Sequence, residues 1–334
     1  MLVTADLHFT DNPRDSYRFD FLPWFEEQAR KKRVSHVVIA GDITEEKDRH
    51  SAWLVNKITG QLKSLSEQCR VVILPGNHDY KTRENPFFEF LKHIPSITWI
   101  SEPSDNPDIG AAADGMPRCL FLPHTANYER DWAKINFKGY YWIFAHNTFT
   151  GARGDNGRQL TGIPLSIFPK DAQVIAGDIH VPQTIGCLTY VGAPYRVDFG
   201  DDYEPRILHL QGGEFDSIPV PGLQKRLVEI NSIADLKRRA KDIAKGDILK
   251  VRVNLNGDER DQWPEMQEQV KEWGREHGFV VHTVQPKMEA AGKSKAVDRS
   301  EARSDAELLE AYAESRGVDE RTLNTGRWLM GKLQ

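Results

Sequence analysis

Residues 70–79 read RVVILPGNHD, a short apolar run that ends in a proline, a glycine and three polar side chains. Four consecutive β-branched or aliphatic residues, 71–74, are typical of a buried β-strand. Asn77, His78 and Asp79 therefore follow the carboxyl end of a predicted strand. Ligands of an open α/β sheet bind at that end, so this stretch indicates a sheet with a polar site at its rim.

Four other predicted strands end in residues of the same kind. The endings are Asp6-x-His8 after residues 1–5, Gly41-Asp42 after 34–40, His146 after 140–145, and Gly177-Asp178-Ile179-His180 after 172–176. Asp6 and Asp42 are 36 residues apart, and Asp42 and Asn77 are 35 apart, and each interval suits one strand–helix unit. The five endings are therefore expected to meet at one rim.

Helix-like stretches alternate with these strands. Apolar side chains recur at helical spacing from Leu54 to Leu65, and an earlier helix is predicted from Asp20 to Arg33. Further strands are predicted over 118–123 and 188–191, and a surface loop over 101–117. Apolar strands alternating with amphipathic helices indicate an α/β fold whose sheet is covered on its faces.

Length and composition narrow the class of protein. A chain of 334 residues suggests about two domains. The three widely spaced cysteines, Cys69, Cys119 and Cys187, exclude a disulfide scaffold and a structural zinc ribbon, and they fit a reducing compartment. With no secretory signal and no membrane-spanning run, a cytoplasmic protein is expected. The net charge of −5 excludes a globally basic nucleic-acid coat, but it leaves open a nuclease with a local groove.

The chain is expected to divide into four parts. Residues 1–218 would form the main domain, 219–286 a small α/β domain, 287–303 a flexible linker, and 304–334 C-terminal helices. Ser304-x-x-Glu307 is a capping box that opens an amphipathic helix, and Gly317 is its expected end. Trp328 and Leu329 in the last helix would either dock on a partner or fold back on the body.

The rim residues have the chemistry of a site for two divalent cations. Carboxylate, amide and imidazole ligands without cysteine suit manganese, iron or zinc. Two such ions can bind a phosphate and activate a bridging water. Asp42 is central in the order and could bridge the ions, and glycines such as Gly41, Gly76 and Gly177 let the backbone turn beside them.

The motifs D-x-H, GD, GNHD, a lone His and G-x-x-H resemble those of the calcineurin-like metallophosphoesterase superfamily. Tyr190-Val-Gly-Ala-Pro194 and Phe199-Gly-Asp201 narrow the resemblance to the SbcD-type nuclease subunit of double-strand-break repair complexes. It implies a four-layer α/β/β/α sandwich with a small α/β capping domain and a helical C-terminal tail. Carried over onto this chain, it implies one metal on Asp6, His8, Asp42 and His180, and a second on Asp42, Asn77, His146 and Asp178.

The resemblance also implies the reaction. A hydroxide between two metals, most simply Mn²⁺ with Mg²⁺, Fe²⁺ or Zn²⁺ as alternatives, would attack a DNA phosphodiester. His78 would serve as the acid, with Asp79 orienting its ring. DNA, an SbcC-type coiled-coil ATPase bound to the C-terminal helices and a second copy of the chain are the implied partners. The role would be exonuclease, with endonuclease action left open, in DNA repair, recombination or degradation.

Two positions depart from the family pattern. Asp178 stands where the family usually has a histidine, and a carboxylate there would favour manganese. Glu45 stands where some members have a histidine that positions DNA, which leaves polarity and duplex preference open. Structural interpretations also stay open at this stage: His146 as a core histidine, Asp178 as a turn cap, and His124 either at the rim or away from it.

Basic clusters and the extra domain leave further alternatives. Arg30 to Arg33 would either bind phosphate or end a helix. Lys237, Arg238, Arg239 and Lys241 would either contact DNA or form a solvated helix face. A small-nucleotide phosphodiesterase or phosphatase is the alternative enzyme, and a non-catalytic scaffold subunit is the alternative outside enzymes.

Overall fold

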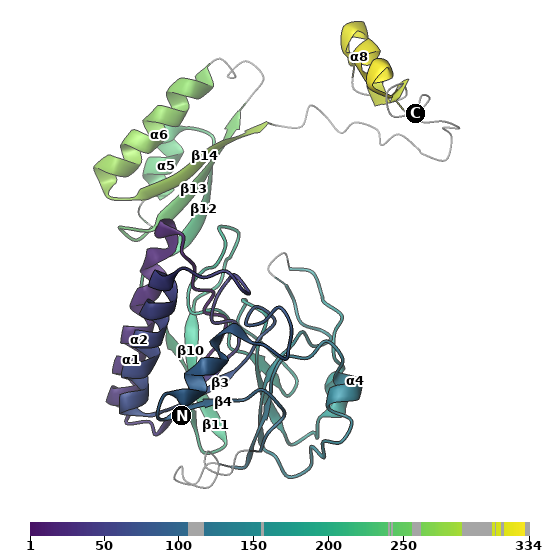
Figure 1. Ribbon diagram of the computed structural model, residues 1–334. Coiled ribbons are helices and arrows are strands. Elements are labelled where there is room, and N and C mark those ends of the chain that lie inside the picture. The colour runs from purple at the N-terminus through teal and green to yellow at the C-terminus, as the bar shows by residue number, and fades with distance from the viewer. Residues whose placement is uncertain are drawn as a thin grey trace.

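Two β-sheets packed face to face form the larger part of the molecule (Figure 1). The computed structural model describes residues 1–105, 117–154, 157–239, 241, 243–255, 262–288, 309–310, 312–314 and 317–330. The first sheet has six strands in the order β11-β10-β1-β2-β3-β4. Their bounds are β1 Leu2–Thr4, β2 His36–Ala40, β3 Arg70–Leu74, β4 Ile97–Trp99, β10 Arg206–Gln211 and β11 Glu214–Pro219.

The second sheet has five strands in the order β5-β6-β7-β9-β8. Their bounds are β5 Cys119–Leu122, β6 Trp142–His146, β7 Gln173–Gly177, β8 Gln183–Ile185 and β9 Leu188–Tyr190. In both sheets the strands that end in polar motifs run parallel to one another. Their carboxyl ends therefore lie at one edge of each sheet. The five motifs are divided between the two sheets, as the α/β/β/α sandwich implied by the resemblance requires.

Alternation along the strands sorts the apolar side chains into layers. Val3, Val38 and Val72 face the second sheet and pack with its Phe121 and Phe144 in a shared core. Their neighbours face outward onto two helices, α1 (Phe21–Lys32) and α2 (Ala52–Gln68). The apolar positions predicted on α2, from Leu54 to Leu65, are buried in that layer. Both predicted helices are therefore confirmed.

The outer face of the second sheet is covered mainly by connecting segments. Trp132, Phe168 and their neighbours pack on it, beside the single-turn helix α4 (Tyr128–Asp131). The described residues of the body also form the 3-10 helices η1 (Pro13–Asp20), η2 (Phe87–His93) and η3 (Leu165–Ile167). The layers thus follow the α/β/β/α order expected from the resemblance, with a thin fourth layer.

The basic run at the end of α1 supports its helix. Arg30, Lys31 and Lys32 occupy the last turn, and Arg33 adopts a left-handed conformation that ends the helix. Cations at a helix C-terminus complement the helix dipole and remain solvated. Of the two interpretations of this run, the structure matches the helix end.

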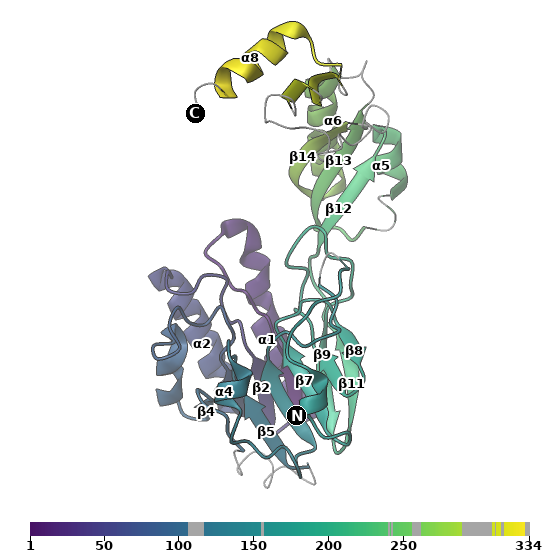
Figure 2. The ribbon, with the colours of Figure 1, turned by 90° about the vertical axis from the view of Figure 1, so that its right-hand side faces the viewer.

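A separate three-stranded parallel sheet follows the body, in the order β12-β13-β14. Its elements are β12 (Lys225–Ile230), α5 (Ile233–Arg239), β13 (Ile248–Leu255), α6 (Trp263–His277) and β14 (Val280–Met288). They have an apolar core of their own, built around Val228, Val251 and Trp273. Figure 2 shows this unit standing beyond the rim of the body.

The C-terminal part is described only in short pieces. Gly317 has a positive φ of 61°, and Val318 N–H bonds to the Ala313 carbonyl, a helix ending at the predicted place. Helix α8 (Glu320–Met330) follows. The predicted helix start at Ser304 and most of the predicted segments 287–303 and 101–117 lie outside the described residues. Within the described residues, no helix has both the length and the apolar character to cross a membrane.

Candidate metal centre

The residues predicted to bind metal lie together at the rim where the two sheets meet. β1, β2 and β3 deliver Asp6, His8, Asp42 and Asn77 from the first sheet. β6 and β7 deliver His146, Asp178 and His180 from the second. A cleft of about 370 Å³ opens over this rim, with Asp42, Asn77 and His78 in its wall.

One group gathers around His8. Ligand atoms of Asp6, His8 and Asp42 all lie within 4.8 Å of one another, and all three residues are buried. His8 Nε2 lies 3.6 Å from Asp42 Oδ2 and 3.1 Å from His180 Nε2. The four residues expected on one metal thus adjoin each other.

The second group gathers around the fully buried His146. Its Nε2 lies 3.1 Å from Asn77 Oδ1, 3.4 Å from Asp42 Oδ1 and 3.9 Å from Asp178 Oδ1. Asp42 therefore turns Oδ1 to this group and Oδ2 to the first. That is the position a bridging carboxylate needs.

Burial and hydrogen bonding fit both groups to cations. His146 Nδ1 donates to the Ala40 carbonyl at 2.6 Å, which leaves Nε2 to face the three side-chain oxygens. Metal-binding histidines are usually oriented by such a bond from the other ring nitrogen. Asp6 Oδ2 is buried with no hydrogen-bond partner, and an unpaired carboxylate oxygen is costly away from water. A divalent cation would satisfy both sets of atoms, so the residues present fit the ions that the motifs imply.

The backbone is strained at the same positions. Asp6, His8, Asp42 and Asp178 all have positive φ, between 43° and 90°. This conformation is uncommon for residues other than glycine, and it costs on the order of 1–3 kcal/mol each. Four strained residues at one rim indicate that the strand ends are shaped to present side chains rather than to relax.

Close packing at the turns explains three of the glycines. A Cβ added to Gly76 would lie 2.1 Å from Asp42 Oδ1, and one added to Gly41 would lie 2.0 Å from His146 Nδ1. A Cβ on Gly177 would meet the Ala40 carbonyl at 2.2 Å. Any larger residue at these three positions would displace a metal-facing side chain or the strand beside it.

We predict that Gly76→Ala weakens both folding and metal binding, because the new methyl group overlaps Asp42. The free energy of unfolding should fall by roughly 1–3 kcal/mol, and Mn²⁺ retained after dialysis should fall with it. Denaturant unfolding and metal analysis measure the two effects. Gly60→Ala in α2 is the matched control, because its Cβ would meet nothing within 4 Å and should add about 1 kcal/mol. Equal metal content in both variants would contradict the prediction.

Asp79 holds the turns together. Its fully buried carboxylate accepts hydrogen bonds from the backbone N–H groups of Asp42, Ile43 and Gly76, at 2.7–2.8 Å. The resemblance assigns Asp79 to the orientation of the His78 ring. Its carboxylate is committed to the backbone instead, so it acts on the centre by fixing the GD and GNHD turns against each other.

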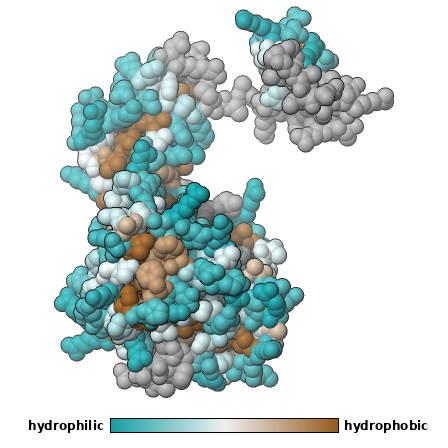
Figure 3. All heavy atoms as spheres, in the orientation of Figure 1, coloured by the Kyte–Doolittle hydropathy of each residue, from teal (hydrophilic) through white to brown (hydrophobic). Residues whose placement is uncertain are grey.

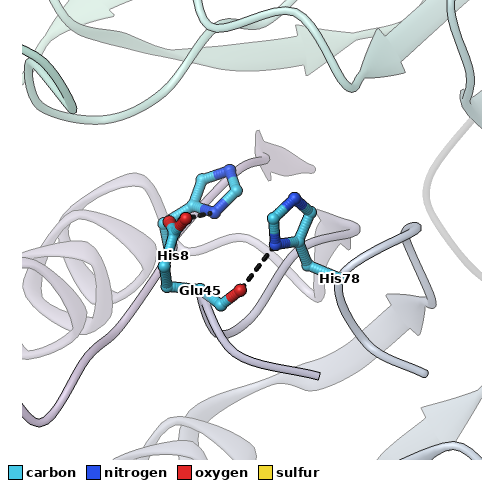
Figure 4. A group of neighbouring side chains, drawn as sticks. All are labelled: His8, Glu45 and His78. Atoms are coloured by element: carbon cyan, nitrogen blue, oxygen red, sulfur yellow. Dashed lines mark hydrogen bonds and ion pairs between the residues drawn. The ribbon is translucent and has the colours of Figure 1, made fainter. Parts of the chain in front are cut away.

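The His78 ring is oriented by Glu45 (Figure 4). His78 Nδ1 donates to the Glu45 backbone carbonyl at 2.6 Å, and the Glu45 carboxylate lies 3.0 Å from His8 Nδ1. The His78 backbone N–H donates to Asp42 Oδ1 at 2.9 Å. Glu45 thus contacts both a predicted metal ligand and the predicted acid. His8, Glu45 and His78 are also close enough together to hold an ion by themselves.

The pKa values of the ionisable side chains at the centre are shifted by burial and by the neighbouring charges. Burial alone would lower the pKa of His146, but the carboxylates of Asp42, Asp6 and Asp178 raise it well above its usual value. Burial opposes ionisation of Asp42, yet His146 and His8 hold its pKa below the usual range. Burial and the nearby Asp42 raise the pKa of Asp79 to about 7, against the effect of its amide bonds. Such concentrated negative charge is what a bound cation would offset.

Some residues near the centre carried little or no sequence signal. Thr148 Oγ1 donates to Asp178 Oδ2 at 2.5 Å and so fixes the carboxylate that departs from the family pattern. The His124 ring lies 6.2 Å from the His146 ring and its Nδ1 meets Tyr80 Oη at 2.5 Å, which places His124 at the rim.

The basic residues predicted to contact DNA do not lie at the metal centre. Lys237, Arg238, Arg239 and Lys241 are exposed on or just after α5, away from the metal-facing residues.

Comparisons with known proteins agree with the motifs. The chain is 23% identical to the SbcD component of the SbcCD nuclease from Escherichia coli K12 over 355 residues, covering 89% of this chain and 83% of that protein. The protein of the same name from E. coli O157:H7 matches equally. A dimetal phosphatase from Danio rerio aligns with a TM-score of 0.37 and 14% identity, covering 66% of this chain and 98% of that one, too distant to carry an argument.

A family model of calcineurin-like phosphoesterases matches residues 1–182, more than half of the chain. The resemblance predicted from the motifs is confirmed, and the enzyme class, a metallophosphoesterase hydrolase that uses divalent metal ions, follows from it. The chain belongs to the calcineurin-like phosphoesterase family.

Proposed function

We propose that this protein is a two-metal phosphodiesterase that cleaves DNA in the manner of an SbcD-type nuclease. The observation that carries the proposal is the position of Asp42, whose two carboxylate oxygens face two separate groups of ligands. His78 lies at the edge of both, in the wall of the cleft. Similarity to the E. coli nuclease component along 89% of the chain supports DNA as the substrate.

Each residue of the centre has a distinct task in this proposal. Asp6, His8 and His180 would hold one ion, Asn77, His146 and Asp178 the other, and Asp42 both. Two divalent cations, Mn²⁺ foremost, would supply the charge that binds a phosphate and the acidity that activates a water. His78 keeps its Nδ1 proton on the Glu45 carbonyl. As the imidazolium it would give its Nε2 proton to the departing sugar oxygen and become the neutral Nδ1–H tautomer.

The second unit supports a polymeric substrate. β12 begins with Lys225, whose side chain lines the same cleft as the metal centre. A small nucleotide needs no such addition, whereas a DNA strand extends well beyond the scissile phosphate. The alternative enzyme is a small-nucleotide phosphodiesterase, and the test below separates it from a DNA nuclease.

The test is hydrolysis of end-labelled duplex and single-stranded DNA, with bis(4-nitrophenyl) phosphate as a small diester beside them. We expect the EDTA-treated chain to be inactive and Mn²⁺ to restore cleavage of DNA, with product lengths giving the polarity. Hydrolysis of the small diester alone would favour the small-nucleotide enzyme. If the metal-loaded chain cleaves neither, the proposal is wrong and the scaffold alternative gains support.

The proposal extends to domains, partners and location. Residues 219–286 would cap the centre, and 304–334, tethered by 287–303, would dock on an SbcC-type ATPase in the cytoplasm. A homodimer is supported by apolar surface on the body, visible beside α1 and α2 in Figure 3. Trp53 of α2 and Phe90 of η2 are 54% and 39% exposed.

A further inference from the structure

The β12-β13-β14 sheet is covered by helices on one face. Val228 and Ile230 of β12 and Leu249, Val251 and Val253 of β13 pack with apolar residues of α5 and α6. Both helices lie on the same side of the sheet in Figure 1. Alternation then turns the intervening residues of each strand to the opposite face, which we call the open face.

The open face is polar and mainly basic. The strand register aligns Glu229, Arg252 and Gln285 in one row, and Leu227, Lys250 and Thr283 in the next. Arg252 and Lys287 both reach Glu229, at 3.3 and 2.9 Å, which confirms that these side chains share a face. Among the described residues of the three strands, the open face carries Lys225, Lys250, Arg252 and Lys287 against Glu229.

The helix-covered side has a smaller excess. α5 and α6 together carry five acidic and five basic residues, and the exposed Lys241 just beyond α5 adds one positive charge. Within α5, Asp235 pairs with Arg238. Among the described residues of this unit, the open face therefore carries the larger positive excess and complements a chain of phosphates better.

The open face is continuous with the metal centre. Lys225, at the start of β12, donates to the Val197 carbonyl at 2.9 Å and lies 2.8 Å from Asp15, both of which line the cleft. His282 of β14 contacts Phe199 of the body, with ring centroids 4.9 Å apart and the ring planes tilted by 54°. A strand lying on the open face therefore passes Lys225 before it reaches the metal ligands.

We propose that the open face of the β12-β13-β14 sheet binds the phosphate backbone of a nucleic acid strand and leads it to the metal centre. Lys250, Arg252 and Lys287 make the phosphate contacts, and Glu229 spaces the cations by holding two of them. This inference rests on the proposed function and adds to it the surface that the substrate occupies. It also moves the expected DNA contacts from α5 to the opposite side of the unit.

The test compares two double variants that remove the same charge. Lys250→Met with Arg252→Met alters the open face, and Lys237→Met with Arg238→Met alters the helix side. DNA binding to the full, Mn²⁺-loaded chain is measured by fluorescence anisotropy between 50 and 200 mM salt, in a His78→Ala background to limit cleavage. Each phosphate contact contributes about 0.7 for single strands and about 0.9 for duplex to the slope of log K against log salt.

We expect the open-face variant to lose about 1.4 to 1.8 from that slope and the helix-side variant to keep the wild-type slope. Exchanging the charges as Lys250→Arg with Arg252→Lys should keep it too, because the phosphate contacts need charge rather than a particular side chain. An unchanged slope in the open-face methionine variant, or a loss confined to the helix-side variant, overturns the inference.

Failure of this inference is distinguishable from failure of the proposed function. A chain that cleaves the small diester but neither binds nor cleaves DNA refutes both. A chain that binds and cleaves DNA while the open-face variant behaves as wild type refutes only the surface assigned here.

Discussion

Replacing Asp42 by asparagine should abolish hydrolysis and reduce metal affinity at both positions by more than about 100-fold. Loss of a residue that merely orients a ligand already costs 10- to 100-fold. Asp42 faces both ligand groups, at 3.6 Å from His8 Nε2 and 3.4 Å from His146 Nε2. An amide would offer one acceptor oxygen, no charge, and an NH₂ group pointed at one of the two groups. Metal content after dialysis against limiting Mn²⁺ measures the effect directly.

Asp171→Asn is the control for this change, because it makes the same chemical substitution on an exposed residue outside the cleft. It should retain both metal content and activity. An Asp42→Asn protein that holds two ions per chain with wild-type affinity would show that Asp42 does not bridge them. A variant that loses one ion and keeps the other would assign Asp42 to a single group.

Replacing His78 by alanine should lower the rate of DNA hydrolysis by about 100- to 10,000-fold, the usual contribution of one acid–base group. Metal content should be unchanged, because the two ligand groups are complete without the imidazole. The measurement pairs single-turnover cleavage of end-labelled DNA with metal analysis of the same sample. His93→Ala, which removes an exposed histidine from the end of η2, serves as the control.

Metal analysis is decisive here because His78 also belongs to a compact set with His8 and Glu45. A fall in metal content together with activity would make His78 a ligand rather than an acid. A fall in rate that is the same for bis(4-nitrophenyl) phosphate, whose leaving group needs little protonation, would also argue against proton donation. The expected pattern is a large loss on DNA and a smaller one on the activated diester.

The parts of the fold that repeat a local pattern could be predicted from sequence. The bounds of the strand that precedes GNHD and the buried positions of α2 can be predicted to within a residue or two. A helix or strand buried on one face has apolar side chains at regular spacing, which is visible in the sequence. The hairpin of β10 and β11 is not indicated by local spacing, and the two-sheet sandwich follows from the resemblance rather than from the spacing of apolar residues. Strand pairing depends on contacts such as Leu2 with His209, far apart in the chain, which no local spacing encodes.

In the candidate site, too, some residues could be predicted from the sequence and others could not. Asp6, Asp42 and His146 could be proposed because each lies within two residues of the end of a predicted strand. The orienting contacts could not: Glu45 acts on His78 through a backbone carbonyl, which any residue type could supply. Asp79 was expected beside the His78 ring, yet its carboxylate meets three amides that only the folded turns bring together.

Because the metal-facing residues are divided between two sheets, the order of synthesis decides when they can come together. His8 and His180, whose ring nitrogens adjoin at 3.1 Å, are 172 residues apart in the chain. A chain emerging from the ribosome contains strands β1 to β4 well before β7 and the His180 that follows it have been made. Until the second sheet closes on the first, the early carboxylates have no imidazole partners across the rim. The candidate metal centre can therefore assemble only after His180 has been made and the second sheet has packed on the first.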